Sequence, residues 1–359
     1  MVLRCLTATL LLAAADYDTT FAQRSMDRYD TDGDQLVSEE EAGKQWIRYG
    51  KLDQDGDGAL SLEEMKKLPQ AYLKHDGKRY LNLCYKQTAE EDLYVDLYLP
   101  RKAGKKPAPL LYYTHGGGWS AGSKHGIAGG SFSSVATALL EEGFAVASVN
   151  YRLCKKGRSV TMYECLEDCK DGLRFLIKDA KKYGIDPNAV YPFGDSAGGH
   201  LAQMMTLSSA ESFVGDPSLA GVRYRVKAGV SWYGPSDFTR NELFSLDGVT
   251  DKRNRFLGRI FKPGEEVNKD AQRVKEISPI YYLSADTPPL YMMQADKDAC
   301  IPVHHAYEMK KKADAVGADF GSVVVKDAGH NWRNVDAAET TPTRDEIIQM
   351  TIDYFLSQR

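Results

Sequence analysis

The sequence predicts an α/β protein, with a mostly parallel sheet that has helices on both faces, preceded by a small all-α module. Strand and helix patterns alternate from about residue 70 to the C-terminus, as in sheets whose parallel strands are joined by crossover helices. Several of these strands are continuous apolar runs, which indicates burial on both faces. The segment before residue 70 is rich in acidic residues instead, and this change in composition indicates a separate module.

The composition is that of a folded protein with a sizeable core. Of the 359 residues, 43% are hydrophobic and 27% are charged, which argues against general disorder. The net charge of -4 argues against nucleic acid as the main partner. The length suits one large domain and a smaller one. We predict a signal peptide over residues 1–23, the acidic module over 24–69 and the α/β domain over 70–359.

The N-terminal segment has the pattern of a secretory signal. Arg4 precedes an apolar run from Cys5 to Ala15, which is too short to cross a bilayer. Cleavage after Ala15 or near Gln23 fits the pattern. No other segment has a long enough apolar run to span a membrane. We therefore expect a secreted or periplasmic protein without stable membrane insertion.

Export would permit disulfide bonds, but their pattern stays open. Cys165 and Cys169 are spaced to lie on one face of a helix, and one of them could bridge Cys154 or lie buried. After signal cleavage an odd number of cysteines would remain, namely Cys84, Cys154, Cys165, Cys169 and Cys300.

Two loops of the acidic module have the spacing of calcium ligands. Each runs for twelve residues, from Asp30 to Glu41 and from Asp53 to Glu64, with acids at positions 1, 3, 5 and 12. Position 7 would contribute its backbone carbonyl. The predicted ligands are Asp30, Asp32, Asp34, Leu36 and Glu41 in the first loop, and Asp53, Asp55, Asp57, Ala59 and Glu64 in the second. The two loops resemble an EF-hand pair, which implies a calcium-binding module.

The two loops differ at position 6, where the chain turns sharply. Gly58 occupies this position in the second loop, but Gln35 occupies it in the first. A non-glycine residue in a left-handed conformation costs about 1–2 kcal/mol, so the first site should bind more weakly, or its turn could be redrawn around Gly33. We expect residues 42–52 to form a single short helix. We also expect calcium to be structural, with no cofactor needed for catalysis.

The elements of the α/β domain follow in chain order, each with its own pattern. The first two strands alternate like an antiparallel pair, and the later apolar strands alternate with helices. The long irregular segment over about 235–286 exceeds an ordinary connection and predicts a lid. The expected strands are 81–87, 93–100, 108–114, 144–153, 189–195, 226–234, 288–296 and 320–330, and the expected helices begin near 133, 163, 197, 304 and 343.

A serine lies between two glycines where a predicted strand meets a predicted helix. The residues Gly194-Asp195-Ser196-Ala197-Gly198 have the pattern G-x-S-x-G. In this setting the chain makes a tight, strained turn that exposes the serine hydroxyl as a nucleophile. The pentapeptide alone is a weak signal, because an ordinary glycine-rich turn has the same composition.

A second glycine-rich segment supports the nucleophile interpretation. The residues His115-Gly116-Gly117-Gly118-Trp119 follow a buried strand, where the second half of an oxyanion hole belongs. Glycines let backbone N–H groups approach a substrate oxygen closely. We predict that Gly117, Gly118 and Ala197 donate these N–H groups.

The remaining chemistry needs a base and an acid. His330 follows the last predicted strand, so it lies at the carboxyl edge of the sheet, where it could reach the serine. Asp298 follows the preceding strand and is the preferred acid, with Asp296 as the alternative. The chain order Ser196, Asp298, His330 is typical of one architecture of serine hydrolase.

These motifs resemble the α/β-hydrolase superfamily over about residues 82–359. "HGGGW" together with "GDSAGGH" is similar to the hormone-sensitive-lipase-like esterases and to bacterial feruloyl and acetyl-xylan esterase-like hydrolases. The resemblance implies ester hydrolysis through an acyl-enzyme. The chain departs from many relatives before the acid, where Gln294-Ala295 replaces His-Gly. The EF-hand pair resembles accessory modules of secreted bacterial carbohydrate-active proteins.

We therefore predict a secreted serine carboxylesterase that hydrolyses short-acyl or carbohydrate esters, with a small-molecule or oligosaccharide ester as substrate. Trp119, Trp232 and Tyr233 are the predicted substrate-binding residues. The lid carries many charges, which argues against a lipid-binding surface. The alternatives are an amidase or exopeptidase of the same fold, a calcium-dependent docking protein, and a non-catalytic module, although no triad residue is missing.

Overall fold

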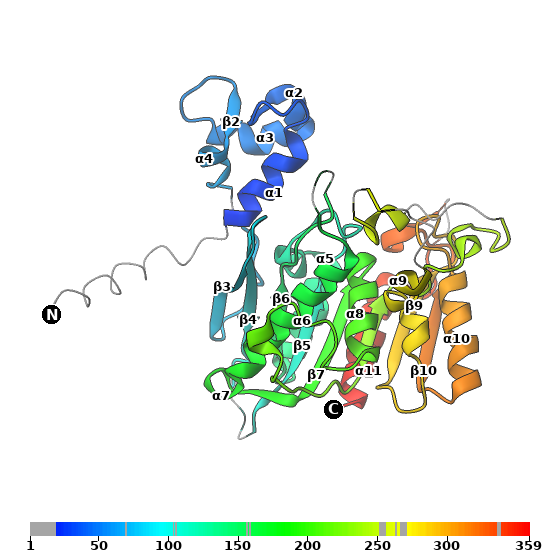
Figure 1. The fold of residues 1–359 in the computed structure, drawn as a ribbon. Helices are drawn as coiled ribbons and strands as arrows, with labels where there is room; N and C mark the ends of the chain where they lie inside the picture. Colours follow the sequence, from blue (N-terminus) through cyan, green and yellow to red (C-terminus); the bar gives the residue numbers. More distant parts are fainter. Residues whose placement is uncertain are drawn as a thin grey trace.

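The chain forms a large α/β body with a small module packed at one edge (Figure 1). The computed structural model describes residues 19–68, 70–102, 104, 106–155, 157, 159–250, 256–262, 264–265, 271–335 and 339–359. Most of the predicted signal peptide, residues 1–18, lies outside the described residues. Its last residues belong to helix α1, Thr19–Tyr29, which crosses the predicted boundary at Gln23.

The small module contains short helices and one short pair of strands. Strands β1 and β2 pair antiparallel and join the two acidic loops. The prediction of one connecting helix over residues 42–52 is wrong. Gly43 ends α2 with a φ of 51°, and two 3₁₀ turns flank α3. The elements are β1 (Leu36–Ser38), α2 (Glu39–Ala42), η1 (Gly43–Gln45), α3 (Trp46–Tyr49), η2 (Gly50–Leu52), β2 (Ala59–Ser61) and α4 (Leu62–Met65).

The large body is built on an eight-stranded sheet with the order β10-β9-β8-β7-β5-β6-β4-β3. β4 pairs antiparallel with β3 and with β6, and all other neighbours are parallel. The predicted mostly parallel sheet is thus confirmed. The strands are β3 (Arg79–Gln87), β4 (Asp92–Tyr98), β5 (Ala108–Thr114), β6 (Ala145–Val149), β7 (Ile185–Asp195), β8 (Gly229–Trp232), β9 (Leu290–Ala295) and β10 (Phe320–Val325).

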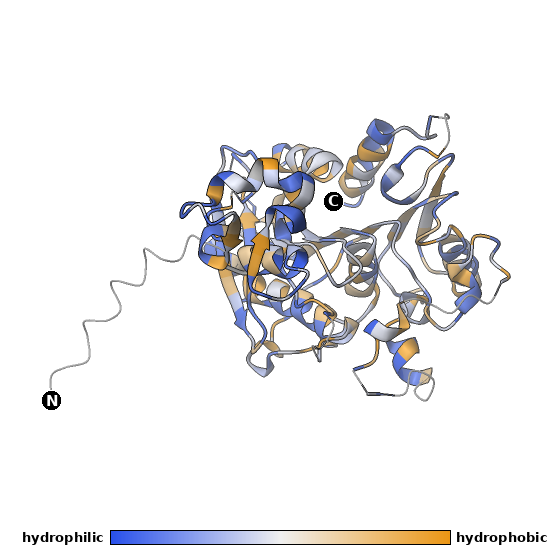
Figure 2. Cartoon of the chain, turned by 90° about the horizontal axis from the view of Figure 1, so that it is seen from above, coloured by the Kyte–Doolittle hydropathy of each residue, from blue (hydrophilic) through white to orange (hydrophobic). Residues whose placement is uncertain are grey.

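Helices cover both faces of this sheet. Residues of α6 and α8 share one apolar core with the strands, and residues of α5 and α11 share a second core on the opposite face. Figure 2 shows hydrophilic and hydrophobic residues side by side on these helices, as expected where one helix face meets the core. None of the described helices is long and apolar enough to cross a membrane. The helices are α5 (Gly130–Glu141), α6 (Met162–Lys178), α7 (Ala180–Tyr183), α8 (Ala197–Leu207), α9 (Ala271–Glu276), α10 (His304–Val316) and α11 (Arg344–Ser357).

The predicted lid, residues 235–286, leaves the end of β8 and has only short elements where it is described. These are η5 (Asn241–Phe244), η6 (Leu257–Arg259), α9 and η7 (Pro279–Tyr282). Phe238 and Phe256 pack edge-on against Trp119, with ring centroids 5.9 and 5.3 Å apart. The segment therefore lies against the loop that follows β5.

Candidate active site

Ser196 lies in a strained turn between β7 and α8. Its φ of 52° and ψ of -119° place it in a region that non-glycine residues rarely occupy, which is typical of functional sites. The flanking glycines are required by close packing. A Cβ atom on Gly194 would lie 2.3 Å from the Gly198 carbonyl oxygen, and one on Gly198 would lie 2.0 Å from the Thr114 carbonyl oxygen. The local sequence therefore permits the turn that exposes the hydroxyl.

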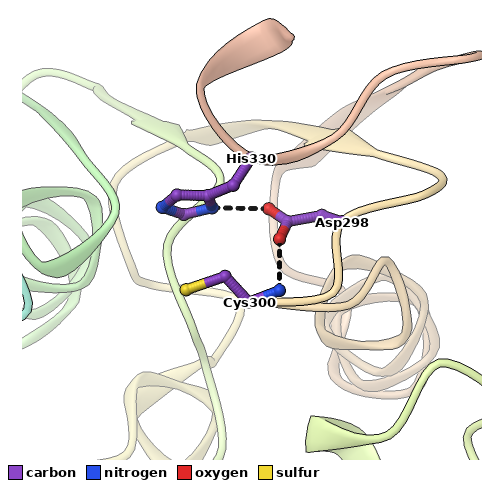
Figure 3. Close-up of side chains that lie close together, drawn as sticks. All are labelled: Asp298, Cys300 and His330. Atoms are coloured by element: carbon purple, nitrogen blue, oxygen red, sulfur yellow. Dashed lines mark hydrogen bonds and ion pairs between the residues drawn. The ribbon is translucent and has the colours of Figure 1, made fainter. Parts of the chain in front are cut away.

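The structure brings Ser196, His330 and Asp298 into one chain of hydrogen bonds. His330 Nε2 lies 3.0 Å from Ser196 Oγ, and His330 Nδ1 lies 2.7 Å from Asp298 Oδ2. The serine follows β7, the aspartate follows β9 and the histidine follows β10, so the three side chains meet at the carboxyl edge of the parallel strands. Figure 3 shows the contact between the imidazole and the carboxylate. This is the arrangement of a nucleophile, a base and an orienting acid.

Asp298 is held rigidly, and Asp296 has a different role. The buried Asp298 carboxylate accepts hydrogen bonds through Oδ1 from the backbone N–H groups of Cys300 (2.7 Å) and Ile301 (2.9 Å). This leaves Oδ2 for the imidazole. Asp296 instead accepts the N–H of Ala328 at 3.3 Å. The geometry therefore favours Asp298 as the acid over the alternative.

The surroundings of His330 favour its charged form. Burial lowers the pKa of His330, but hydrogen bonds with Asp298 and Cys300 outweigh burial and raise its pKa to about 9. A raised pKa means that the site stabilises the imidazolium relative to neutral imidazole. That ion forms when the histidine accepts the serine proton, so the same contacts would assist the proton transfer.

The predicted oxyanion-hole residues lie on two neighbouring segments. Gly117 and Gly118 follow β5 with φ values of 114° and 59°, and Ala197 is the first residue of α8. A Cβ atom on Gly117 would lie 2.2 Å from the Ala121 carbonyl oxygen, so glycine is required there. N–H groups in a tight loop and at a helix N-terminus are suited to an anionic oxygen.

Asp195, which was not among the predicted site residues, joins these two segments. Its Oδ1 accepts hydrogen bonds from the Tyr113 hydroxyl and from the Gly116 N–H, both at 2.9 Å. Burial raises the pKa of Asp195 to about 6. The carboxylate thus fixes the glycine loop beside the serine turn. The only indication in the sequence was an acidic residue directly before the serine.

The small N-terminal module, or front module, also contacts the glycine loop that follows β5. Arg24 of α1 is only 8% exposed. Its guanidinium donates hydrogen bonds to the carbonyl oxygens of Gly122 (2.8 Å) and Tyr151 (2.7 Å). The Tyr151 hydroxyl in turn donates to the His115 carbonyl oxygen at 2.7 Å. The module is therefore packed against the loop that contains the predicted oxyanion glycines.

The three predicted substrate-binding residues are all buried, at 2% exposure or less. The Trp119 indole N–H lies 3.3 Å from His200 Nδ1, and the Trp232 N–H donates to Thr351 Oγ1 at 3.0 Å. Trp232 ends β8 and lines a cavity of about 250 Å³ together with Tyr233, so its substrate-binding role stays a prediction. Tyr233 packs edge-on against the triad histidine, with ring centroids 4.8 Å apart, so it positions that ring.

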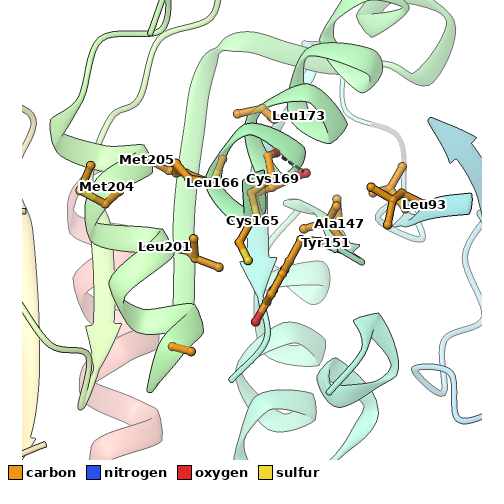
Figure 4. Packing of buried hydrophobic residues seen from close by; sticks show 14 of the residues in the cluster. Leu93, Ala147, Tyr151, Cys165, Leu166, Cys169, Leu173, Leu201, Met204 and Met205 are labelled. Carbon is orange, nitrogen blue, oxygen red and sulfur yellow. Dashed lines mark hydrogen bonds between the residues drawn. The ribbon is translucent and has the colours of Figure 1, made fainter. Parts of the chain in front are cut away.

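The cysteines of α6 lie in the core, away from the serine. Cys165 and Cys169 are buried among residues of the sheet and of α8, as Figure 4 shows. Cys154 faces Cys165, with the two sulfur atoms 3.6 Å apart and no disulfide between them. Among the described cysteines, Cys300 is the one that lies at the triad.

The two acidic loops adopt the same turn despite their different residues at position 6. Gln35 has a φ of 71° and Gly58 a φ of 84°. The first loop therefore turns at position 6, as the second does, and its turn has not moved to Gly33. Asp30 accepts the N–H groups of Gly33 (2.7 Å) and Gln35 (3.0 Å). Asp53 makes the corresponding bonds in the second loop. Gln35 therefore bears the strain expected of a non-glycine residue there.

Some of the predicted calcium ligands lie close together, and others do not. Oxygen atoms of Asp30, Asp32 and Glu41 lie within 4.8 Å of one another, as do those of Asp53, Asp55 and Asp57. Such a set of carboxylate oxygens fits a hard cation. The structure does not bring the other predicted side-chain ligands, Asp34 and Glu64, into these clusters. Glu64 caps α4 by accepting the Ser61 N–H, and Leu36 and Ala59 begin the paired strands β1 and β2.

Comparisons with known proteins point to one family. The BD-FAE family profile matches residues 95–313. LipM of Mycobacterium tuberculosis, which is named a "Probable carboxylic ester hydrolase", is 30% identical over 200 residues, covering 55% of this chain and 43% of LipM. Esterase LipC of the same organism is 27% identical over 256 residues, covering 70% of this chain and 60% of LipC. The chain thus spans about half the length of these curated relatives.

Solved structures show the same fold. A truncated carbohydrate esterase from gut microbiota superposes with a TM-score of 0.64 at 22% identity, covering 81% of this chain and 99% of the other. Native esterase 2 of Thermogutta terrifontis gives a TM-score of 0.60 at 19% identity, covering 81% and 92%. The prediction of an α/β-hydrolase fold is confirmed.

Proposed function

Because this chain belongs to the BD-FAE family, we propose that it is a serine carboxylesterase that hydrolyses short-acyl or carbohydrate esters through an acyl-enzyme. The observation that carries the proposal is the hydrogen-bonded chain from Asp298 through His330 to Ser196. The names of its relatives, carboxylic ester hydrolases and esterases, support the same reaction class.

In the proposed mechanism Ser196 Oγ attacks the ester carbonyl while His330 Nε2 accepts its proton. Asp298 orients the ring and stabilises the imidazolium. The N–H groups of the glycine loop and of Ala197 stabilise the oxyanion, with each donor typically contributing about 2.7–4 kcal/mol to transition-state stabilisation. The histidine then protonates the leaving alcohol, and a water molecule repeats the sequence on the acyl-enzyme.

The charged residues of the lid favour a polar substrate over a lipid. Arg259 lies over the glycine loop, since a Cβ atom on Gly118 would be 3.2 Å from its Nη1. Arg240 forms ion pairs with Glu242 and Glu308 on the lid side of the body. Guanidinium groups suit sugar hydroxyls or carboxylates, whereas a lipid-binding surface would be apolar. The relative described as a carbohydrate esterase is consistent with this substrate class.

A substrate panel tests this proposal and its alternatives. It should contain acetylated and feruloylated oligosaccharides, short and long nitrophenyl esters, and anilides of the same acyl groups. We expect kcat/KM to be highest for short-acyl or sugar esters. Faster hydrolysis of the anilides would favour the amidase or exopeptidase alternative. Strong activation by a long-chain triglyceride at an oil–water interface would contradict the substrate class.

We also propose that the protein is exported and that its signal peptide ends before α1. The α1 residues Ala22 and Met26 belong to the apolar core of the front module, and Arg24 of the same helix reaches the large body. Cleavage after Ala15 keeps this helix intact, whereas cleavage near Gln23 would remove part of it. N-terminal sequencing of exported protein distinguishes the two sites.

The front module is proposed to bind calcium in a structural role. The two carboxylate clusters, with Glu64 and the carbonyls at position 7, would hold the ions, and calcium would supply charge neutralisation there. An ion that binds only the folded chain stabilises it by about 2.7 kcal/mol at a hundredfold excess over its Kd. The alternative of a calcium-dependent docking protein predicts partner binding that a chelator abolishes.

Asp53→Ala should weaken calcium binding more than Asp30→Ala, because Gln35 already strains the first loop. Titration calorimetry of both variants measures this difference. Chelation should lower the melting temperature of the module, while hydrolysis of a small ester at moderate temperature is retained. Equal losses in both variants, or loss of turnover on chelation in a body that stays folded, would contradict this account.

A further inference from the structure

Three potential metal ligands meet at the imidazole of His330. One ligand atom from each of Asp298, Cys300 and His330 lies within 4.8 Å of the other two. In Figure 3 the Cys300 sulfur lies on the same side of the Asp298 carboxylate as the His330 ring, and the thiol contributes to the raised pKa of His330. Carboxylate, thiolate and imidazole are together a ligand set for zinc.

This group of ligands can be reached from solvent. A surface cavity of about 540 Å³ is lined by Cys300 and His330, together with Gly329 and Asn331. The Cys300 and His330 side chains are partly exposed, although the Asp298 carboxylate is buried. A small ion could therefore reach the sulfur and the ring without unfolding the sheet edge.

We propose that Asp298, Cys300 and His330 form an inhibitory site for a thiophilic divalent cation such as Zn²⁺. The metal would bind Asp298 Oδ2, Cys300 Sγ and His330 Nδ1, with water as a fourth ligand. Oδ2 and Nδ1 would separate from 2.7 Å to about 3.4 Å, the spacing of two ligands on a tetrahedral zinc. A small rotation of the imidazole would allow the two atoms to separate by this distance.

Metal binding at Nδ1 removes the base. The Nδ1 lone pair forms the metal bond, so the single proton of the neutral ring must move to Nε2. The thiol loses its proton to solvent. With Nε2 protonated, His330 cannot accept the Ser196 proton, and the carboxylate that stabilised the imidazolium is bound to the metal. The site therefore couples metal occupancy to loss of turnover.

Inhibition of nitrophenyl acetate hydrolysis by Zn²⁺ tests the proposal, in saturating calcium and a non-thiol reductant. Cys84 is an exposed cysteine, so Cys84→Ser is the matched control for Cys300→Ser. We expect Cys84→Ser to keep the wild-type inhibition constant. Cys300→Ser should need at least about tenfold more zinc, since loss of even an outer-shell partner typically costs about 10–100-fold in metal affinity. Equal inhibition of the wild type and Cys300→Ser would overturn the proposal.

A direct binding measurement separates this inference from the proposed function. Ser196→Ala retains all three ligands, and addition of Co²⁺ should produce a thiolate-to-cobalt absorption band. Adding Cys300→Ser to this variant should abolish the band. Should Cys300→Ser fail to fold, peptide mass spectrometry of the wild type provides a second test. Zn²⁺ should then slow alkylation of Cys300 but not of Cys84. An unchanged band, or an unchanged rate of Cys300 alkylation, would refute the site even if the protein proved not to be an esterase.

Discussion

Ser196→Ala should lower kcat for ester hydrolysis by about a millionfold, which is the scale of loss when the nucleophile of a serine hydrolase is removed. The hydroxyl that contacts His330 Nε2 at 3.0 Å is the only nucleophile that the triad presents. Alanine keeps the backbone turn, because the strain at this position comes from its φ of 52° and is the same for both residues. Steady-state kinetics with a nitrophenyl ester measures the effect.

The control for this variant is Ser209→Ala, at an exposed serine just beyond α8. It should keep wild-type turnover, and both variants should keep the wild-type melting temperature. Substantial turnover by Ser196→Ala, in protein freed of contaminating esterases, would exclude this serine as the nucleophile.

Asp298→Asn should lower kcat by about 10⁴-fold, as the corresponding change does in other triads. The amide cannot stabilise an imidazolium and favours the wrong tautomer of His330. Asp296→Asn is the matched control and should have a much smaller effect, because Asp296 contacts the Ala328 N–H and not the ring. Kinetics of the two variants rank the carboxylates, and the reverse order would transfer the role to Asp296.

The residual activity of Asp298→Asn should also change its pH dependence. His330 must be neutral to accept a proton, so kcat/KM falls as the pH drops through the pKa of His330. The Asp298 hydrogen bond raises that pKa, so its loss should move the acid limb of the profile to lower pH. An acid limb that does not move would show that another group controls it.

Much of the fold was predictable because short sequence patterns indicate its strands and helices. The buried strands are continuous apolar runs, and the patterns of period 2 and 3.6 hold over long segments such as α6. The triad was also predictable in outline, because the glycines around Ser196 and the positions of Asp298 and His330 after successive strands follow from the topology.

The remaining features depend on tertiary contacts that no local pattern reveals. Arg24 is an ordinary basic residue in its helix, and only the packing of two modules places it behind the glycine loop. Asp195 is buried, and its carboxylate accepts a hydrogen bond from the Tyr113 hydroxyl of β5. Trp232 donates its indole N–H to Thr351 of α11, a partner 119 residues further along the chain.

The proposed function depends on one covalent intermediate, an ester of Ser196 with the acyl group of the substrate. The most direct test is rapid acid quenching during turnover of a slowly deacylated ester, followed by peptide mass spectrometry. The wild type should carry the acyl group on the peptide containing Ser196, and the Ser196→Ala variant should carry none. An acyl group on a different residue, or steady turnover by the wild type with no acylated peptide at any quench time, would contradict this mechanism.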